Sequence, residues 1–147
     1  METSKSSLPD RPGESLRLLL VDDHNLARSG LRSLVATWPE FEIVGEASQG
    51  EEAIRAVEKL RPDIVLMDFR MPGMNGVEAT RVIKAQWPDV KVAMLTVYVE
   101  YRAQAAAAGA DEFLDKYLPT TKLRKLLVSL GQRGRQESGS EDSSKPS

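Results

Sequence analysis

Short apolar runs recur along the chain, and each ends at a polar residue or a turn. The run from Ile64 to Met67, for example, lies between Pro62 and Asp68. These runs lack the alternation of apolar and polar residues that is typical of a strand with one exposed face. They therefore predict strands that are buried on both sides in a parallel sheet. The segments with this pattern are Leu16–Val21, Phe41–Ala47, Asp63–Asp68, Val90–Thr96 and Glu112–Lys116.

Helical patterns fill the intervals between these strands and follow the last one. The alanine-rich segment at about residues 100–108 offers little bulky apolar surface, so we expect this helix to dock weakly and to move easily. Five strands that alternate with five helices predict an α/β fold with helices on both faces of the sheet. The clearest helix is the last, where leucines recur on one face at Leu123, Leu126, Leu127 and Leu130.

Residues that favour helix ends predict where three of these helices begin or end. Ser48 with Glu51, and Asn75 with Glu78, have the spacing of a capping box, in which side chain and backbone bond reciprocally at a helix start. Gly109 is suited to the left-handed residue that follows a helix.

Composition and charge narrow the class of protein. A chain of 147 residues with 41% apolar and 29% charged residues suits one globular domain. The net charge of -2 gives no case for a nucleic-acid-binding surface, and the lack of cysteine excludes disulfides and thiolate zinc sites. No apolar run approaches the length of about 18 residues that a membrane span needs, and the N-terminus has no signal-peptide core. We therefore expect a cytoplasmic protein that does not bind membranes.

Both ends of the chain differ in composition from its middle. Residues 1–14 are polar and rich in Ser, Pro and Gly, and residues 131–147 are rich in Gly, Ser, Gln and charges. Such segments bury too little apolar surface to fold. We expect a disordered N-terminal tail over 1–14, a folded domain over 15–130 and a disordered C-terminal tail over 131–147.

Polar residues stand at the carboxyl ends of the predicted strands. Asp22 and Asp23 follow the first strand, Asp68 ends the third, Thr96 the fourth and Lys116 the fifth. A parallel α/β sheet brings all these ends to one edge, which is where such folds place ligand chemistry. Three crowded carboxylates repel one another, and a hard cation such as Mg²⁺ relieves that repulsion. We therefore expect a Mg²⁺ site at this edge.

A phosphoryl group suits the remaining groups at this edge. An Asp carboxylate can act as the nucleophile and form an acyl phosphate, and the Lys116 ammonium can neutralise charge on the transferred group. The Thr96 hydroxyl can donate a hydrogen bond to a phosphoryl oxygen. Each residue also has a purely structural alternative: a turn for Asp68, an ion pair with Asp68 for Lys116, and an ordinary strand position for Thr96.

Several motifs together resemble the receiver domain of bacterial two-component response regulators, over about residues 15–130. The residues Asp22-Asp23-His24 with Arg28, Gly30 and Leu31 look most like the NarL/FixJ-type subgroup. The other matching pieces are Val65-Leu66-Met67-Asp68, Met71-Pro72-Gly73-Met74-Asn75-Gly76, Leu95-Thr96, Gly109-Ala110-Asp111 and Phe113-Leu114-Asp115-Lys116.

This resemblance implies a flavodoxin-like doubly wound sheet of five parallel strands in the order 2-1-3-4-5. It implies that Asp68 accepts a phosphoryl group from a phosphohistidine of a sensor histidine kinase or phosphotransfer protein. Mg²⁺ would be held by Asp22, Asp23, Asp68 and the backbone carbonyl of Arg70. Thr96 would be the switch hydroxyl, Phe113 the switch aromatic, and Lys116 a contact of the phosphoryl group. The chain would be no enzyme beyond promoting its own phosphorylation and dephosphorylation.

Three features near the predicted site either depart from the family pattern or are not part of it. Tyr117 follows Lys116 where many receivers have a proline in a cis peptide, and the sequence leaves the form of this bond open. Val97 is bulkier than the small residue that often follows the switch Thr, and we expect it to narrow access to Asp68. Arg70 and Tyr98 flank the site and are large, and we hypothesise that they slow attack of water on the acyl phosphate. His24 is the only histidine, and at the start of a helix we favour a solvated position over a metal ligand.

The output of the chain stays open at this point. The resemblance implies either a stand-alone receiver that acts on a downstream protein or the N-terminal part of a longer DNA-binding regulator, with a possible homodimer on phosphorylation. One alternative is a pseudo-receiver that binds partners without phosphate. Another is a Mg²⁺-dependent phosphohydrolase, which we rank lower because no second acid or base group is visible. The chain itself is not expected to bind nucleic acid.

Overall fold

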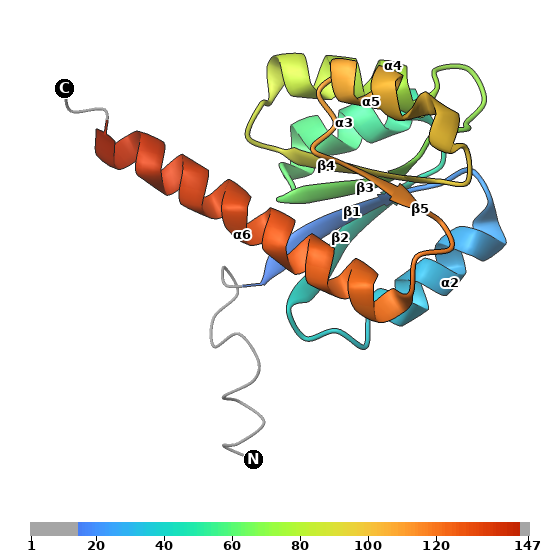
Figure 1. Cartoon of the computed structure of the whole chain (residues 1–147), viewed down its shortest axis with the longest axis horizontal. Helices are drawn as coiled ribbons and strands as arrows, with labels where there is room; N and C mark the ends of the chain where they lie inside the picture. Colours follow the sequence, from blue (N-terminus) through green and yellow to red (C-terminus); the bar gives the residue numbers. More distant parts are fainter. Residues whose placement is uncertain (1–14, 145–147) are drawn as a thin grey trace.

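A computed structural model describes residues 15–144 of the chain, with side chains up to residue 136. The predicted disorder of residues 1–14 lies outside the described residues. The fold is a single sheet of five parallel strands in the order β2-β1-β3-β4-β5, so the predicted order is confirmed (Figure 1). The elements are β1 Leu16–Val21, α2 Asn25–Val35, β2 Phe41–Ala47, α3 Gly50–Leu60, β3 Ile64–Asp68, α4 Gly76–Gln86, β4 Lys91–Thr96, the 3-10 helix η1 Val99–Tyr101, α5 Arg102–Ala107, β5 Glu112–Asp115 and α6 Thr120–Ser144.

Helices cover both faces of the sheet, as the apolar runs predict. Helices α2 and α6 lie on one face, and α3, α4 and α5 lie on the other (Figure 1). Alternate side chains of one strand serve the two layers: Leu18 and Leu20 of β1 belong to the core under α2 and α6, whereas Leu19 and Val21 belong to the core under α3 and α4. Every residue of β3 is buried, which explains why its sequence shows no alternation.

Two of the predicted helix ends are confirmed and one is wrong. The Asn75 side chain accepts from the Glu78 backbone at 2.9 Å, and the Glu78 side chain accepts from the Asn75 backbone at 3.0 Å. Gly109 has a φ of +100°, as expected for a left-handed cap. At the start of α3, however, Ser48 donates its backbone N–H and its hydroxyl to Glu52, not Glu51. The helix begins at Gly50, which places Glu52 on the third helical residue.

The alanine-rich segment forms the short elements η1 and α5. Ala105 is the only residue of α5 that is buried among those the structure describes, which agrees with the small apolar area expected from its composition. Its predicted mobility stays a prediction.

Helix α6 corrects the expected C-terminal boundary. The leucine pattern ends at Leu130, but the helix continues to Ser144. The extension has contacts of its own: a Cβ built on Gly131 would lie 2.7 Å from Leu16, and Arg135 donates to the Ser15 carbonyl at 2.6 Å. The close packing of Gly131 on Leu16 and the bond from Arg135 therefore hold the first part of this extension. The division of the chain into one domain and two tails otherwise remains a prediction.

None of the helices within residues 15–144 combines the length and the hydropathy that a membrane crossing needs.

Candidate functional site

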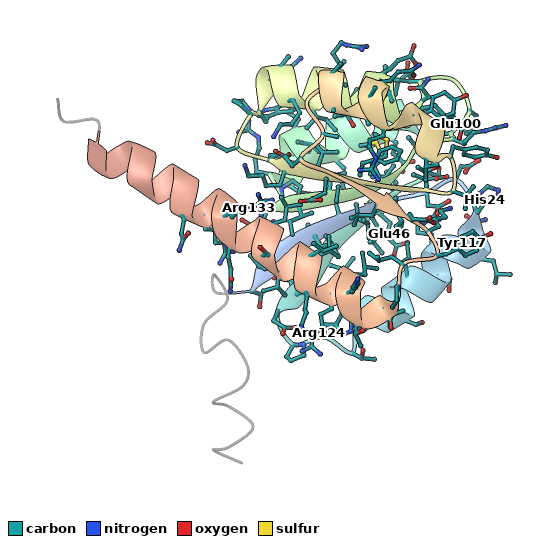
Figure 2. All side chains as sticks on the ribbon, in the orientation of Figure 1. His24, Glu46, Glu100, Tyr117, Arg124 and Arg133 are labelled. Carbon is teal, nitrogen blue, oxygen red and sulfur yellow. The ribbon has the colours of Figure 1, made fainter. Side chains whose placement is uncertain are left out.

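The carboxyl ends of the strands bring four of the predicted site residues to one edge of the sheet. Asp22 follows β1, Asp68 ends β3, Thr96 ends β4 and Lys116 follows β5. Asp68 is 5% exposed, and Asp22 and Thr96 are buried as well. His24 and Tyr117 lie toward this same edge, at the right of the view (Figure 2). The sequence-based expectation that these groups share one edge is therefore confirmed.

An acidic cluster forms at this edge. One carboxylate oxygen each of Asp22, Asp23 and Asp68 and one ring nitrogen of His24 lie within 4.8 Å of one another. Lys116 places a cation next to these carboxylates: its Nζ is 3.5 Å from Asp68 Oδ1 and 3.7 Å from Asp22 Oδ2. Three carboxylates thus face one ammonium group.

The cluster carries an excess of negative charge. Burial raises the pKa of the Asp68 carboxyl above its usual range; Lys116 opposes this shift, while Asp22 and Asp23 add to it. The Oδ1 atom of Asp23 is buried and accepts no hydrogen bond among the described residues, although His24 Nδ1 lies 3.1 Å from it. Hard oxygen ligands with unbalanced charge suit Mg²⁺, so the residues present fit the expected ion.

A short hydrogen-bond network holds Asp22, the first of the two acidic residues that follow β1. The Asp22 Oδ1 atom accepts from the His24 backbone at 2.9 Å, and the guanidinium of Arg28 donates to the Asp22 carbonyl. Arg28 also donates to Asn25 at 3.0 Å and to Glu46 of β2 at 2.9 Å. Arg28 therefore fixes the turn between β1 and α2. Sequence reasoning did not predict this positioning role, for which the one signal is an arginine in the first turn of the helix that follows the acidic pair.

Helix α4 begins directly against the strand that carries Asp68. Gly76 donates its backbone N–H to the Phe69 carbonyl at 2.8 Å. A Cβ added at Gly76 would lie 2.5 Å from the Asp68 carbonyl oxygen and 2.9 Å from Phe69 Cα, which is closer than any side chain permits. Only glycine therefore fits between α4 and the Asp68 backbone.

Thr96 connects the ends of β4 and β5. Its hydroxyl oxygen accepts from the Tyr98 backbone at 3.1 Å, and its carbonyl accepts from the Lys116 backbone at 3.0 Å. A change in the Thr96 side chain thus acts directly on the segment that leads into η1. The peptide bond between Lys116 and Tyr117 is trans, which answers the question that the sequence left open.

A cleft of about 290 Å³ opens above Asp68. Arg70 and Tyr98 form part of its rim, with the Arg70 guanidinium 4.9 Å from the centre of the Tyr98 ring. Tyr98 meets Tyr101 edge-on, and Tyr101 stacks on Phe69 with ring centres 4.2 Å apart. The residues that line the cleft are His24, Asp68, Arg70, Thr96, Val97, Tyr98 and Lys116.

Phe113 lies outside this cleft, among buried side chains. It is 9% exposed and packs in a cluster with Met94, Ala105 and Ala108. The Arg102 guanidinium of α5 lies 5.2 Å from the centre of its ring. The aromatic side chain of β5 is therefore in contact with the helix that follows Thr96.

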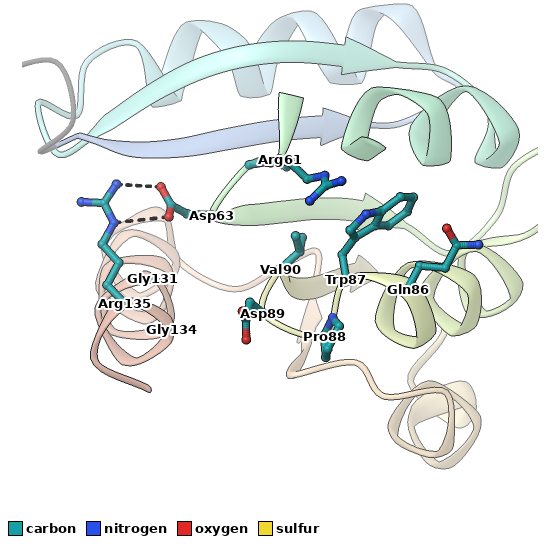
Figure 3. A pocket seen from close by; sticks show the side chains of 11 residues that line it. Arg61, Asp63, Gln86, Trp87, Pro88, Asp89, Val90, Gly131, Gly134 and Arg135 are labelled. Carbon is teal, nitrogen blue, oxygen red and sulfur yellow. Dashed lines mark hydrogen bonds and ion pairs between the residues drawn. The ribbon is translucent and has the colours of Figure 1, made fainter. Parts of the chain in front are cut away.

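A second cleft, of about 440 Å³, lies at the opposite edge of the sheet. Figure 3 shows Asp63, which precedes β3, paired with Arg135 of α6. The two side chains form two bonds, of 2.8 and 3.3 Å. Nearby, the Arg61 guanidinium lies 5.4 Å from the centre of the Trp87 ring. This cleft is at the far end of β3 from the acidic cluster.

The comparisons with known proteins agree with the geometry. Residues 18–128 match the family described as the response regulator receiver domain. The chain is 38% identical over 121 residues to the transcriptional regulatory protein DegU of Brevibacillus brevis, which covers 81% of this chain and 51% of that protein. It is 39% identical over 126 residues to the response regulator protein VraR of Staphylococcus aureus, covering 84% and 59% respectively. The chain thus spans only about half of the length of these relatives.

Solved structures show the same fold. A two-component response regulator of the LuxR family from Aurantimonas sp. SI85-9A1 superimposes with a TM-score of 0.76 at 32% identity, covering 80% of this chain and 86% of that chain. The signal receiver domain of the putative response regulator NarL from Mycobacterium tuberculosis gives a TM-score of 0.75 at 28% identity, covering 81% and 98%.

Proposed function

This chain belongs to the response regulator receiver domain family, and from that premise we propose that Asp68 accepts a phosphoryl group from a phosphohistidine of a sensor histidine kinase or phosphotransfer protein. The observation that carries the proposal is the position of Asp68: a buried carboxylate at the mouth of β3, beneath a cleft and 3.5 Å from the Lys116 ammonium. The family is one of receiver domains and not of enzymes that turn over a separate substrate.

In the transfer step, a carboxylate oxygen of Asp68 attacks phosphorus and the bond between phosphorus and the donor nitrogen breaks. The electron pair of that bond stays with the donor imidazole, and an acyl phosphate forms on Asp68. The Lys116 ammonium neutralises part of the charge on the phosphoryl oxygens. Asp22, Asp23, Asp68 and the Arg70 carbonyl would hold Mg²⁺, which when bound supplies further positive charge at those oxygens. Attack of water on the acyl phosphate would later restore the Asp68 carboxylate.

The phosphoryl group acts on the rest of the molecule through Thr96. In the structure, the Thr96 hydroxyl oxygen accepts a hydrogen bond from the Tyr98 backbone. When the hydroxyl donates to a phosphoryl oxygen, it turns away from the Tyr98 backbone and this bond is lost. That change loosens the segment leading into η1 and α5, and it alters the packing of Phe113 against α5. A shift of population from 1:99 to 99:1 requires about 5.5 kcal/mol of preference of the phosphoryl group for the active form.

The partners follow from the same proposal. The phosphoryl donor binds at the cleft, and the altered surface of β5 and the neighbouring helices contacts a downstream protein or an attached output domain. Because the DegU protein is a transcriptional regulatory protein about twice as long as the matched part, an N-terminal part of a longer DNA-binding regulator is the main alternative to a stand-alone receiver. A cytoplasmic location and a homodimer on phosphorylation stay predictions.

The deciding experiment is the intact mass of the protein after incubation with Mg²⁺ and acetyl phosphate. We expect one added phosphoryl group on the native chain, none on Asp68→Ala and none with a chelator. Asp89→Ala, which removes an exposed carboxylate at the other edge of the sheet, should be phosphorylated like the native chain. If neither small donor nor phosphorylated kinase modifies the native chain, the protein is a phosphate-independent pseudo-receiver.

A further inference from the structure

The imidazole of His24 faces the acidic cluster. His24 stands at the start of α2 but makes no side-chain cap bond there. Its Nδ1 atom lies 3.1 Å from Asp23 Oδ1 and 3.4 Å from Asp22 Oδ1, although 68% of the side chain is exposed. The side chain also lines the cleft above Asp68. One nitrogen therefore faces the carboxylates while the rest of the ring lies in solvent.

The distances suit one shared ion. Ligand atoms that lie about 2.1 Å from an octahedral ion are about 3 Å apart when adjacent and about 4 Å apart when opposite. The His24 nitrogen and the three carboxylate oxygens lie within 4.8 Å of one another, so small side-chain rotations bring all four to such an ion. Asp23 Oδ1 is buried and is the nearer of the two carboxylate oxygens that face His24, so an ion held by Asp23 would lie beside the imidazole.

We propose that Nδ1 of His24 is a further metal ligand of this site and that it turns the preference of the site from Mg²⁺ toward a transition-metal ion such as Mn²⁺ or Co²⁺. The inference rests on the proposed function, because it concerns the same metal site. Mg²⁺ takes oxygen ligands, whereas imidazole binds the later first-row metal ions more tightly. The structure places the nitrogen ligand beside the two carboxylates expected to hold the ion.

The first test is a spectroscopic one on the chain without an affinity tag, loaded with Mn²⁺. His24 is the only histidine of the chain, so a nitrogen coupling typical of imidazole in pulsed electron paramagnetic resonance can come from no other residue. We expect this coupling in the native protein and in Leu26→Ala, which changes a neighbouring side chain that is 87% exposed. The coupling should be absent in His24→Ala.

The second test is calorimetric and compares two metals. We expect His24→Ala to lower the ratio of Co²⁺ affinity to Mg²⁺ affinity by about tenfold or more, the range in which loss of metal-site partners is usually felt. His24→Asn, which offers a hard oxygen in place of nitrogen, should also lose the preference for Co²⁺. Native-like coupling in His24→Ala, no coupling in the native chain, or an equal loss of both affinities would each overturn the proposal. His24 would then be a solvated ion-pair partner of Asp23.

The two proposals fail separately. Phosphorylation of the native chain at Asp68 in Mg²⁺ without any imidazole coupling in Mn²⁺ refutes the role of His24 and leaves the receiver function standing. Imidazole coupling without phosphorylation by any donor supports a metal site with a nitrogen ligand and refutes the phosphoacceptor.

Discussion

The two ends of β3 carry carboxylates in opposite situations. Asp63, just before the strand, accepts from the Arg17 backbone at 2.8 Å and forms two bonds with Arg135 (Figure 3). Asp68, at the other end, has Lys116 at 3.5 Å and shares that cation with Asp22. One carboxylate is balanced by its partners, and the other lies in a cluster with excess negative charge.

This difference separates a structural charge from a reactive one. A carboxylate whose oxygens are all bonded gains little from a cation and makes a poor nucleophile, whereas one with a raised pKa and incomplete partners binds cations and reacts. The same strand is therefore anchored at one end and chemically available at the other.

Removing the cation at the reactive end should have the largest effect. We expect Lys116→Ala to slow phosphorylation of Asp68 by acetyl phosphate about 100-fold, because the loss of one group that stabilises transition-state charge has effects of that size. The rate is measured by intact mass over time in Mg²⁺. Lys122→Ala, which removes an exposed lysine of α6, should leave the rate unchanged, and a native rate in Lys116→Ala would show that the ammonium serves only the ion pairs.

Removing the carboxylate at the anchored end should affect stability and not phosphorylation. We expect Asp63→Ala to lower the free energy of unfolding by about 1–3 kcal/mol, because the substitution leaves the Arg17 backbone N–H without its acceptor and removes the two bonds between Asp63 and Arg135. Urea unfolding checks this value. Asp89→Ala is the matched control, since that carboxylate is exposed. A stability loss as small as in the control would mean that solvent replaces the bonds of Asp63 in full.

Removing the charge at the reactive end should stabilise the fold. Burial raises the pKa of Asp68 in the folded state, so the folded state favours the protonated carboxyl. The stability that this contributes is present below the unfolded-state pKa and is lost as the pH rises through the folded-state pKa. Asp68→Asn does not ionise, so its free energy of unfolding should exceed that of the native chain increasingly as the pH rises.

Urea unfolding at several pH values from about 4 to about 8 measures this difference. Mg²⁺ should narrow it, because the ion stabilises the native cluster more than the variant. A difference between Asp68→Asn and the native chain that does not change with pH would contradict the assigned charge imbalance.

The smallest effect should come from the rim of the cleft. We expect replacement of Arg70 and Tyr98 together by serine to shorten the half-life of the phosphoryl group by about a few-fold, because the two side chains limit the approach of water to the acyl phosphate. Their contact supports this role, since the Arg70 guanidinium lies over the Tyr98 ring. An unchanged half-life, measured by loss of the mass adduct, would refute the hypothesis.

Much of the fold was predictable because its strands are buried on both faces. The bounds of β1 and β2 agree with the apolar runs, and those of the other strands differ by one residue at one end. The convergence of Asp22, Asp68, Thr96 and Lys116 on one edge followed from the parallel topology. These features are local in sequence or follow from a general rule of α/β folds.

The features that could not be predicted depend on contacts distant in sequence. Nothing near Asp63 in the sequence indicates a bond to Arg135, 72 residues later. That bond helps to hold the part of α6 that follows its last leucine. The role of Arg28 likewise requires Glu46 of the neighbouring strand. The position of the His24 ring depends on the rotation of its side chain, which cannot be predicted from the periodicity or the spacing of residues in the sequence.

Gly76 limits how this receiver can diversify. A saturation mutagenesis library should return almost no folded variants at this position, because any Cβ would collide with the Asp68 backbone. At Gly30, where nothing lies within 4 Å, many residues should survive, and alanine should gain about 0.5–1 kcal/mol of stability in mid-helix. Beside Asp68, the side chains of Arg70, Val97 and Tyr98 at the cleft leave more room for variation than Gly76 does. If Arg70 and Tyr98 set the lifetime of the phosphoryl group, as we propose, substitutions there would change that lifetime while the strand and helix that present Asp68 stay the same.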